Sequence, residues 1–95
     1  MNKNDKLALK DIADHYGLRV QSLKLIEEMT ELTQSLSKLL IDPYDEGIDE
    51  NVEEEVADVN IMLKQLIYLC SIEDEVNEIM HQKIARQLER IKDES

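Results

Sequence analysis

The chain has 95 residues, a formal charge of −11 from 22 acidic and 11 basic side chains, and a hydrophobic fraction of 42%. We expect a single domain over residues 1–95, because this length is near the lower limit for one unaided core. The hydrophobic fraction is enough for a packed core and argues against a wholly disordered chain. The net charge argues against nucleic acid or an anionic membrane as the main partner, because a negative field repels phosphate groups.

Turn residues and cysteine are scarce. Two glycines and one proline supply few of the tight turns that a β-rich fold needs, so we expect an all-α protein. Cys70 stands alone, which excludes an internal disulfide. No apolar run reaches transmembrane length, and residues 1–11 contain no long apolar core, so we expect no membrane association and a cytoplasmic location.

Four helices are expected, the first two on either side of Gly17. Leu7 to Tyr16 reads as a short first helix, and Gly17 suits the left-handed residue that ends it. Leu18 to Ile41 follows as a long second helix. Its apolar stripe is Leu25, Met29, Leu32, Leu36 and Leu40.

The second pair of helices follows a loop over residues 42–47, which contains the only proline and the second glycine. A third helix is expected to start near Asp49 or Asn51, either of which can cap it, and to run to about Cys70. Ser71 is expected to cap a fourth helix that continues to about Ile91. Short connections between such helices predict an antiparallel four-helix bundle.

Acidic residues occur on the apolar faces of the second and third helices. On a helical wheel of about 100° per residue, Glu55 falls in the centre of the third helix's stripe and Asp58 about 60° away. Glu28 lies about 40° from Leu32, with Glu31 and Glu27 further round on the same side. Burying an unpaired carboxylate costs several kcal/mol, so Glu55 needs a partner, a metal or a proton.

These carboxylates predict a cation site when the two helices meet. Glu28 and Glu31 against Glu55 and Asp58 would gather four oxygen-donor side chains, which hard divalent cations such as Mg²⁺ bind. On the fourth helix, Lys83 interrupts the apolar stripe. Its ammonium can reach a phosphate or the acidic cluster, or its stem can pack on the core while its head reaches solvent.

The order of these features resembles the MazG-like family of all-α NTP pyrophosphatases, relatives of the dimeric dUTPases. The matching segments are LIEEMTELTQSL, VEEEVADVNIML and KIARQLERI, within residues 25–91. The resemblance implies a Mg²⁺-dependent hydrolase, with Mn²⁺ as a possible substitute. It would convert a nucleoside triphosphate to the monophosphate and pyrophosphate, in clean-up or control of the nucleotide pool.

The resemblance also assigns roles to residues of this chain. The metal ligands by position are Glu28, Glu31, Glu55 and Asp58. Glu27 matches the first acid of the EExxE motif and is assigned to a second metal or to orienting the attacking water. Lys83 and Arg86 resemble the basic residues that contact the phosphates.

The third helix is apolar nearly all round. Its apolar residues outside the main stripe are Val56, Ile61, Leu63, Ile67 and Tyr68. A helix of this kind is buried on every side, which so short a chain cannot achieve alone. We therefore expect a homodimer or homotetramer that associates through the central helices, and the resemblance places the active site near or across the interface.

Two other functions fit the sequence. A small acidic helical bundle can be a non-catalytic interaction module that binds a basic partner, in which case Glu55 pairs with Lys83 or Arg86 and binds no metal. Alternatively, the chain can be a nucleotide-binding relic that keeps the fold without catalysis. The sequence does not specify which base is preferred.

Overall fold

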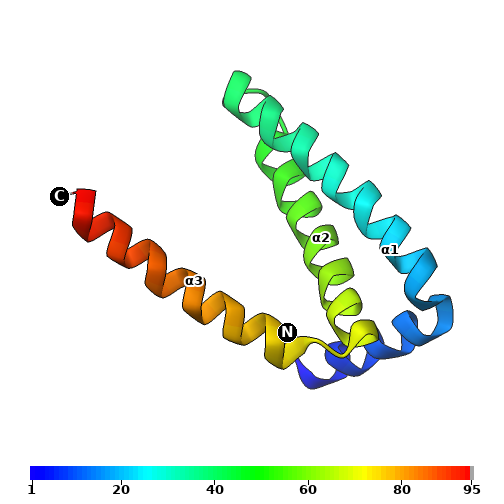
Figure 1. Cartoon of the computed structure of the whole chain (residues 1–95). Coiled ribbons are helices and arrows are strands. Elements are labelled where there is room, and N and C mark those ends of the chain that lie inside the picture. Colours follow the sequence, from blue (N-terminus) through cyan, green and yellow to red (C-terminus); the bar gives the residue numbers. More distant parts are fainter. Residues whose placement is uncertain (95) are drawn as a thin grey trace.

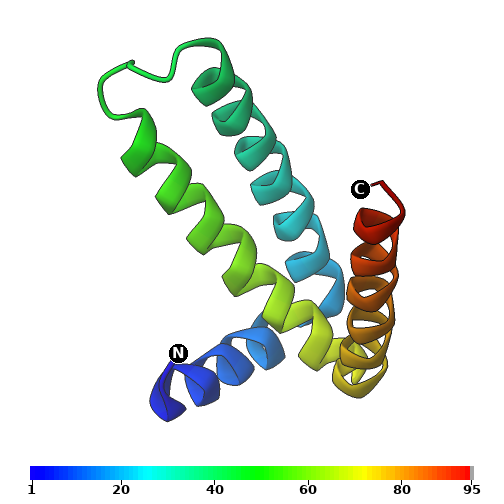
Figure 2. The same cartoon turned by 90° about the vertical axis from the view of Figure 1, so that its left-hand side faces the viewer.

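The computed structural model describes residues 1–94 and contains three α-helices: α1 (Lys3–Ile41), α2 (Ile48–Cys70) and α3 (Glu73–Glu94). Within these residues there is no strand, so the all-α expectation is confirmed. Helices α1 and α2 run antiparallel and pack side by side along the upper part of α1 (Figures 1 and 2). No helix in the described range is both long and apolar enough to cross a membrane.

The predicted four-helix bundle was wrong: within residues 1–94 there are three helices, and α3 makes almost no contact with the other two. The two segments expected on either side of Gly17 adjoin without a loop, across a kink at the expected left-handed glycine. Gly17 has φ 84° and ψ 171°, a region that is essentially restricted to glycine. Helical hydrogen bonding continues on both sides of this residue, so the axis changes direction without a connecting loop. As a result, the first part of α1 crosses the end of the α1–α2 pair (Figure 1).

The ends of α1 and α2 at residues 41 and 70 lie where the sequence placed them, and α2 starts near the expected Asp49 but with a different N-cap. Helix α2 begins at Ile48, and its N-cap is Gly47, at φ 81°, with no side-chain capping hydrogen bond. The expected caps, Asp49 and Asn51, are already inside the helix. Asp49 lies in the first turn, where the helix dipole favours an acid.

The predicted N-cap of the last helix was also wrong. Ser71 is instead the C-cap of α2, with φ 54°, and its backbone N–H donates to the carbonyl oxygens of Ile67 and Tyr68. Helix α3 starts two residues later, at Glu73. In its left-handed conformation, Ser71 satisfies carbonyl oxygens at the end of α2. Its backbone therefore lacks the extended conformation that an N-cap residue adopts.

Polar contacts between α1 and α2 recur every seven residues. Gln21 Nε2 donates to Gln65 Oε1 at 2.7 Å, and the Ser35 hydroxyl donates to Asn51 Oδ1. Between these two contacts, Glu28 lies beside Asp58. The three polar pairs are therefore Gln21–Gln65, Glu28–Asp58 and Ser35–Asn51, with members seven residues apart on each helix.

This heptad spacing is typical of helices that pack at a shallow angle, with one seam facing the partner throughout. Apolar side chains, including Leu25 and Met62, are buried between the polar pairs. A polar residue at a seam position selects the register in which it finds its partner. The three polar pairs thus define the register of the α1–α2 pair, and with it the residues that meet across the seam.

Helix α3 projects away from the other two helices and makes almost no packing contact with them (Figures 1 and 2). The radius of gyration is 16.5 Å, whereas a compact chain of similar length has a value of about 13 Å. Most of the apolar stripe of α3 is more than half exposed: Met80 at 53%, Ile84 at 56%, Leu88 at 57% and Ile91 at 60%. One chain therefore does not close its own apolar core.

The buried amide pair provides a test of the seam. Gln65→Leu leaves the Gln21 Nε2 group buried without its acceptor, so we expect it to destabilise the fold by about 1–3 kcal/mol. Replacing both residues with Leu removes the unsatisfied group, so the double variant is expected to recover to near wild-type stability or above. Urea unfolding measures both, and Gln82→Leu, at an exposed position on α3, is the control. Equal losses in the single and double variants would contradict the pairing.

Candidate metal centre

Three glutamates from the two packed helices converge at the middle of the seam. Glu28 and Glu31 on α1 and Glu55 on α2 each offer a carboxylate oxygen, and the three oxygens lie within 4.8 Å of one another. Glu28 is 5% exposed, and the other two residues are half-buried. The antiparallel register thus brings the EExxE segment of α1 against the ExxD segment of α2.

Two of the oxygens in this cluster have no hydrogen-bond partner. Glu28 Oε2 and Glu55 Oε2 are both buried, and neither accepts a hydrogen bond from any described group. An unsatisfied buried acceptor costs about 1–3 kcal/mol, and more when it is charged. The cluster therefore presents two buried acceptors, from opposite helices, that a cation would satisfy.

Asp58 adjoins the cluster through Glu28. It is exposed and lies outside the group of three converging oxygens. The pKa of its carboxyl is raised above 3.8, first by partial desolvation and then by the negative charge of Glu28. Of the four predicted metal ligands, the structure brings Glu28, Glu31 and Glu55 to one point and places Asp58 at its edge.

Glu31 is affected by the same crowding of negative charge. Its pKa is raised above 4.5, first by the charge of Glu28 and then by partial desolvation and the charge of Glu55. Like charges at this separation disfavour simultaneous ionisation. Glu31 and Asp58 are therefore harder to ionise beside Glu28 than they would be in free solution.

Lys24 is a basic residue of the site that the sequence analysis missed. Its Nζ lies 3.1 Å from Glu28 Oε1 and 3.7 Å from Glu27 Oε2. The pKa of Lys24 is raised, mainly by its hydrogen bond to Glu28. The signal was present in the sequence, because a lysine four residues before a glutamate shares its helix face. This ammonium compensates one oxygen of Glu28 and leaves the other, Oε2, without a partner.

The predicted catalytic residues lie apart from the converging oxygens. The Glu27 side chain is 58% exposed and contacts Lys24. Lys83 and Arg86 are exposed on α3, which does not pack on the seam. Among residues 1–94, neither forms an ion pair with an acid of the cluster. A single copy of the chain therefore does not bring these two basic side chains to the acids.

Carboxylate oxygens that converge from facing helices are the ligands that hard divalent cations prefer. In helical bundles, metal sites are commonly built in this way from side chains of adjacent helices. The chain matches no protein-family model, no curated protein and no solved structure.

The raised pKa values predict a specific dependence of stability on pH. For Glu31 and Asp58 the folded pKa lies above the unfolded value, near 4.5 and 3.8 respectively. The folded state therefore binds protons more tightly, and this stabilising contribution is complete in acid and is lost as pH rises through the raised values. In EDTA at neutral pH, Glu31→Gln and Asp58→Asn are expected to melt at a higher temperature than the wild type.

The difference in Tm between each variant and the wild type is expected to vanish in acid, where the carboxyls are protonated. Glu53→Gln, which removes an exposed charge on α2 outside the cluster, is the matched control. A lower Tm for Glu31→Gln or Asp58→Asn at neutral pH would show that these carboxylates stabilise the fold, contrary to the electrostatic argument.

Proposed function

We propose that the chain is a Mg²⁺-dependent nucleoside triphosphate pyrophosphohydrolase. The observation that supports this function most directly is the pair of buried, unpartnered oxygens of Glu28 and Glu55, which belong to opposite helices of one glutamate cluster. The resemblance of the EExxE and ExxD segments to the MazG-like family is consistent with it. The reaction releases pyrophosphate and leaves the nucleoside monophosphate.

The donor set fits a hard cation, so Glu28, Glu31 and Glu55 would hold Mg²⁺ or Mn²⁺, with Asp58 at the edge of the site. When bound, the cation neutralises the triphosphate and lowers the pKa of a coordinated water. Lys24 keeps one oxygen of Glu28 in an ionic hydrogen bond, which fixes the orientation of that carboxylate.

Glu27 is next to Glu28 but faces solvent, where a substrate would approach. In our proposal its carboxylate accepts a hydrogen bond from the attacking water and orients it toward the α-phosphorus. The water oxygen then bonds to the α-phosphorus and its proton passes to the Glu27 carboxylate, while the bond from the α-phosphorus to the bridging oxygen breaks and pyrophosphate leaves. Lys83 and Arg86 would stabilise the charge that develops on the phosphates.

We further propose that a homodimer or homotetramer completes the site. The accessible surface is 7702 Å², about 2,000 Å² more than is typical of a folded monomer of this mass, which exposes about 5,700 Å². A standard interface buries about 800 Å² per partner, so the excess is large enough for a stable assembly. Apolar residues of α2 that stay exposed, including Val56, Ile61 and Leu63, are candidates for this interface.

Charge complementarity supports the same assembly. Lys83 interrupts the apolar stripe of α3, and Arg86 and Arg90 lie along one flank of it, in a chain of net charge −11. An α3 helix that docks its stripe on a second copy would carry these cations toward that copy's acidic cluster. The phosphate-contacting residues and the metal ligands would then belong to different chains.

The interaction-module reading expects Glu55 to pair with Lys83 or Arg86. Within the described residues Glu55 forms no such ion pair, and its buried Oε2 has no partner. The metal-dependent reading therefore agrees better with the geometry. The nucleotide-binding relic has the same geometry and is distinguished by turnover alone.

Pyrophosphate release is the direct test. We expect release from a panel of nucleoside triphosphates with Mg²⁺ and none in EDTA. Glu55→Gln is expected to lower turnover at least about 100-fold, because it changes a direct ligand and the loss of residues that only support a ligand already costs about 10- to 100-fold. Its stability in EDTA is expected to be unchanged or higher. Glu53→Gln is the control and should retain activity. Absence of release from every triphosphate with folded protein would overturn catalysis and leave the relic or the interaction module.

Mixed assemblies test whether the site is shared between chains. Glu55→Gln and a Lys83→Gln/Arg86→Gln double variant are each expected to be inactive alone. When they are unfolded together and refolded as a mixture, some assemblies will combine an intact acidic cluster with an intact α3 from the other chain, and partial activity should return. If no activity returns from verified mixed oligomers, the basic residues do not act across the interface.

A further inference from the structure

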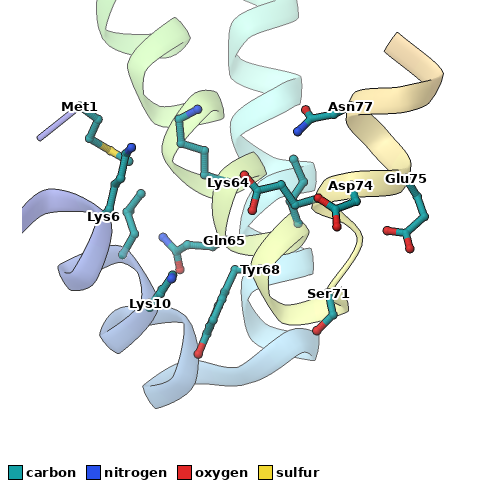
Figure 3. Close-up of a pocket in the computed structure, with 13 residues that line it drawn as sticks. Met1, Lys6, Lys10, Lys64, Gln65, Tyr68, Ser71, Asp74, Glu75 and Asn77 are labelled. Carbon is teal, nitrogen blue, oxygen red and sulfur yellow. The ribbon is translucent and has the colours of Figure 1, made fainter. Parts of the chain in front are cut away.

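A second potential binding site lies at the other end of the α1–α2 pair. A cavity of about 760 Å³ is bounded by the N-terminal part of α1, the C-terminal half of α2 and the start of α3 (Figure 3). It shares no residue with the glutamate cluster. Lys64, in its wall, is six residues beyond Asp58, or about 9 Å along the helix axis.

Three lysines and three acids line this cavity, the lysines on α1 and α2 and the acids (Glu73, Asp74 and Glu75) on α3. Lys6 and Lys10 on α1 and Lys64 on α2 line it, and none of them forms an ion pair with a described residue. The Lys10 ammonium instead lies 5.6 Å from the centre of the Tyr68 ring. The cavity therefore has a positive side on α1 and α2 and a negative side on α3, and an anionic group is attracted to the lysine side.

A buried donor faces the same space. Gln65 is 1% exposed and lines the cavity. Its Oε1 accepts from Gln21, while the nearest acceptor for its Nε2 is Met62 Sδ at 3.8 Å, which is a weak acceptor. Figure 3 shows the Gln65 carboxamide directed toward the part of α1 that carries Lys6 and Lys10. A ligand oxygen would give this amide the strong acceptor that it lacks.

The wall formed by α3 is acidic, whereas the lysines lie on α1 and α2. Glu73, Asp74, Glu75 and Asn77 line this side, and Asp74 and Asn77 lie across the cavity from the α1 lysines (Figure 3). No ion pair within residues 1–94 bridges the two walls. A complementary ligand therefore carries an anionic group at one end and hydrogen-bond donors at the other, and the apolar surface of Leu9, Ile67 and the Tyr68 ring suits a planar body between them.

We propose that this cavity binds a nucleoside monophosphate whose base carries an exocyclic amine. The phosphate contacts Lys6, Lys10 and the Gln65 amide, and the base amine donates to Asp74 or Asn77. Carboxylates accept hydrogen bonds from the amino group of cytosine, whereas uracil presents a carbonyl oxygen at that position and would face an acid. The site is independent of the glutamate cluster and requires no divalent cation.

Titration calorimetry in EDTA, on the full chain, tests the proposal without metal at the other site. The ligands are CMP, UMP and inorganic phosphate. Saturable binding of CMP is expected, at least about tenfold tighter than that of UMP or phosphate. The exposed pair Lys6→Gln/Lys10→Gln should weaken CMP binding at least tenfold, and Lys3→Gln, outside the cavity on the same helix, should leave it unchanged.

Failure of this site and failure of the proposed catalysis give different results. CMP binding that persists in Glu55→Gln supports a separate site, whereas binding that is lost in that variant assigns the nucleotide to the glutamate cluster and overturns the proposal. An absence of saturable CMP binding also overturns it, as does a Kd that Lys6→Gln/Lys10→Gln does not change. Phosphate that binds as tightly as CMP would show a simple anion site without base recognition.

Discussion

The heptad ladder of polar pairs between α1 and α2 is the constraint on which the rest of the structure depends. Gln21–Gln65, Glu28–Asp58 and Ser35–Asn51 occupy seam positions that helices usually fill with apolar side chains. Each amide or hydroxyl is satisfied only when its partner lies directly opposite, since an unpaired buried polar group is costly. Because the outer two pairs satisfy each other, they hold the register in which the charged middle pair must meet. The acids thus face one another although their own interaction opposes it.

The packing of α1 against α2 therefore positions the candidate metal ligands at the middle of the seam. The stability supplied by the apolar layers and by the outer pairs offsets the repulsion among Glu28, Glu31 and Glu55, and Lys24 relieves part of it. A site held in this way is preorganised, because the carboxylates are positioned by the fold before a cation arrives. A protein that gathers acids only on a flexible surface would let them separate. The same reasoning explains why the raised pKa values occur at Glu31 and Asp58, which border Glu28.

Helical periodicity predicted much of this arrangement, and the reasons for its failures are physical. The wheel placed Glu28 and Glu55 on inward faces because burial follows a period that local sequence encodes. It predicted the helical break at Gly17, which has φ 84°. It did not predict that the two segments would adjoin as one kinked element, since a glycine at positive φ can end a helix or bend it, and only tertiary packing decides. The approach of α1 to α2 explains why two separate acidic motifs meet, whereas nothing in the sequence of α3 could place Lys83 or Arg86, because that helix finds little to pack on within one chain. Lys24 was not predicted because the wheel was used to find acids on the apolar face, and Lys24 is a cation one turn before Glu28.

The short connection over residues 42–47 has a consequence for the composition of the acidic cluster. Shifting α2 by one heptad along α1 would still match polar positions with polar positions, and would bring Glu28 opposite Asn51 in place of Asp58. The ladder alone does not discriminate between these alignments, since both repeat every seven residues. Such a shift would require the turn to move by about half a heptad into the end of a helix, away from Pro43 and from Gly47 at φ 81°. The turn residues thus choose which carboxylates become neighbours, some fifteen to twenty ångströms along the helices from the turn itself.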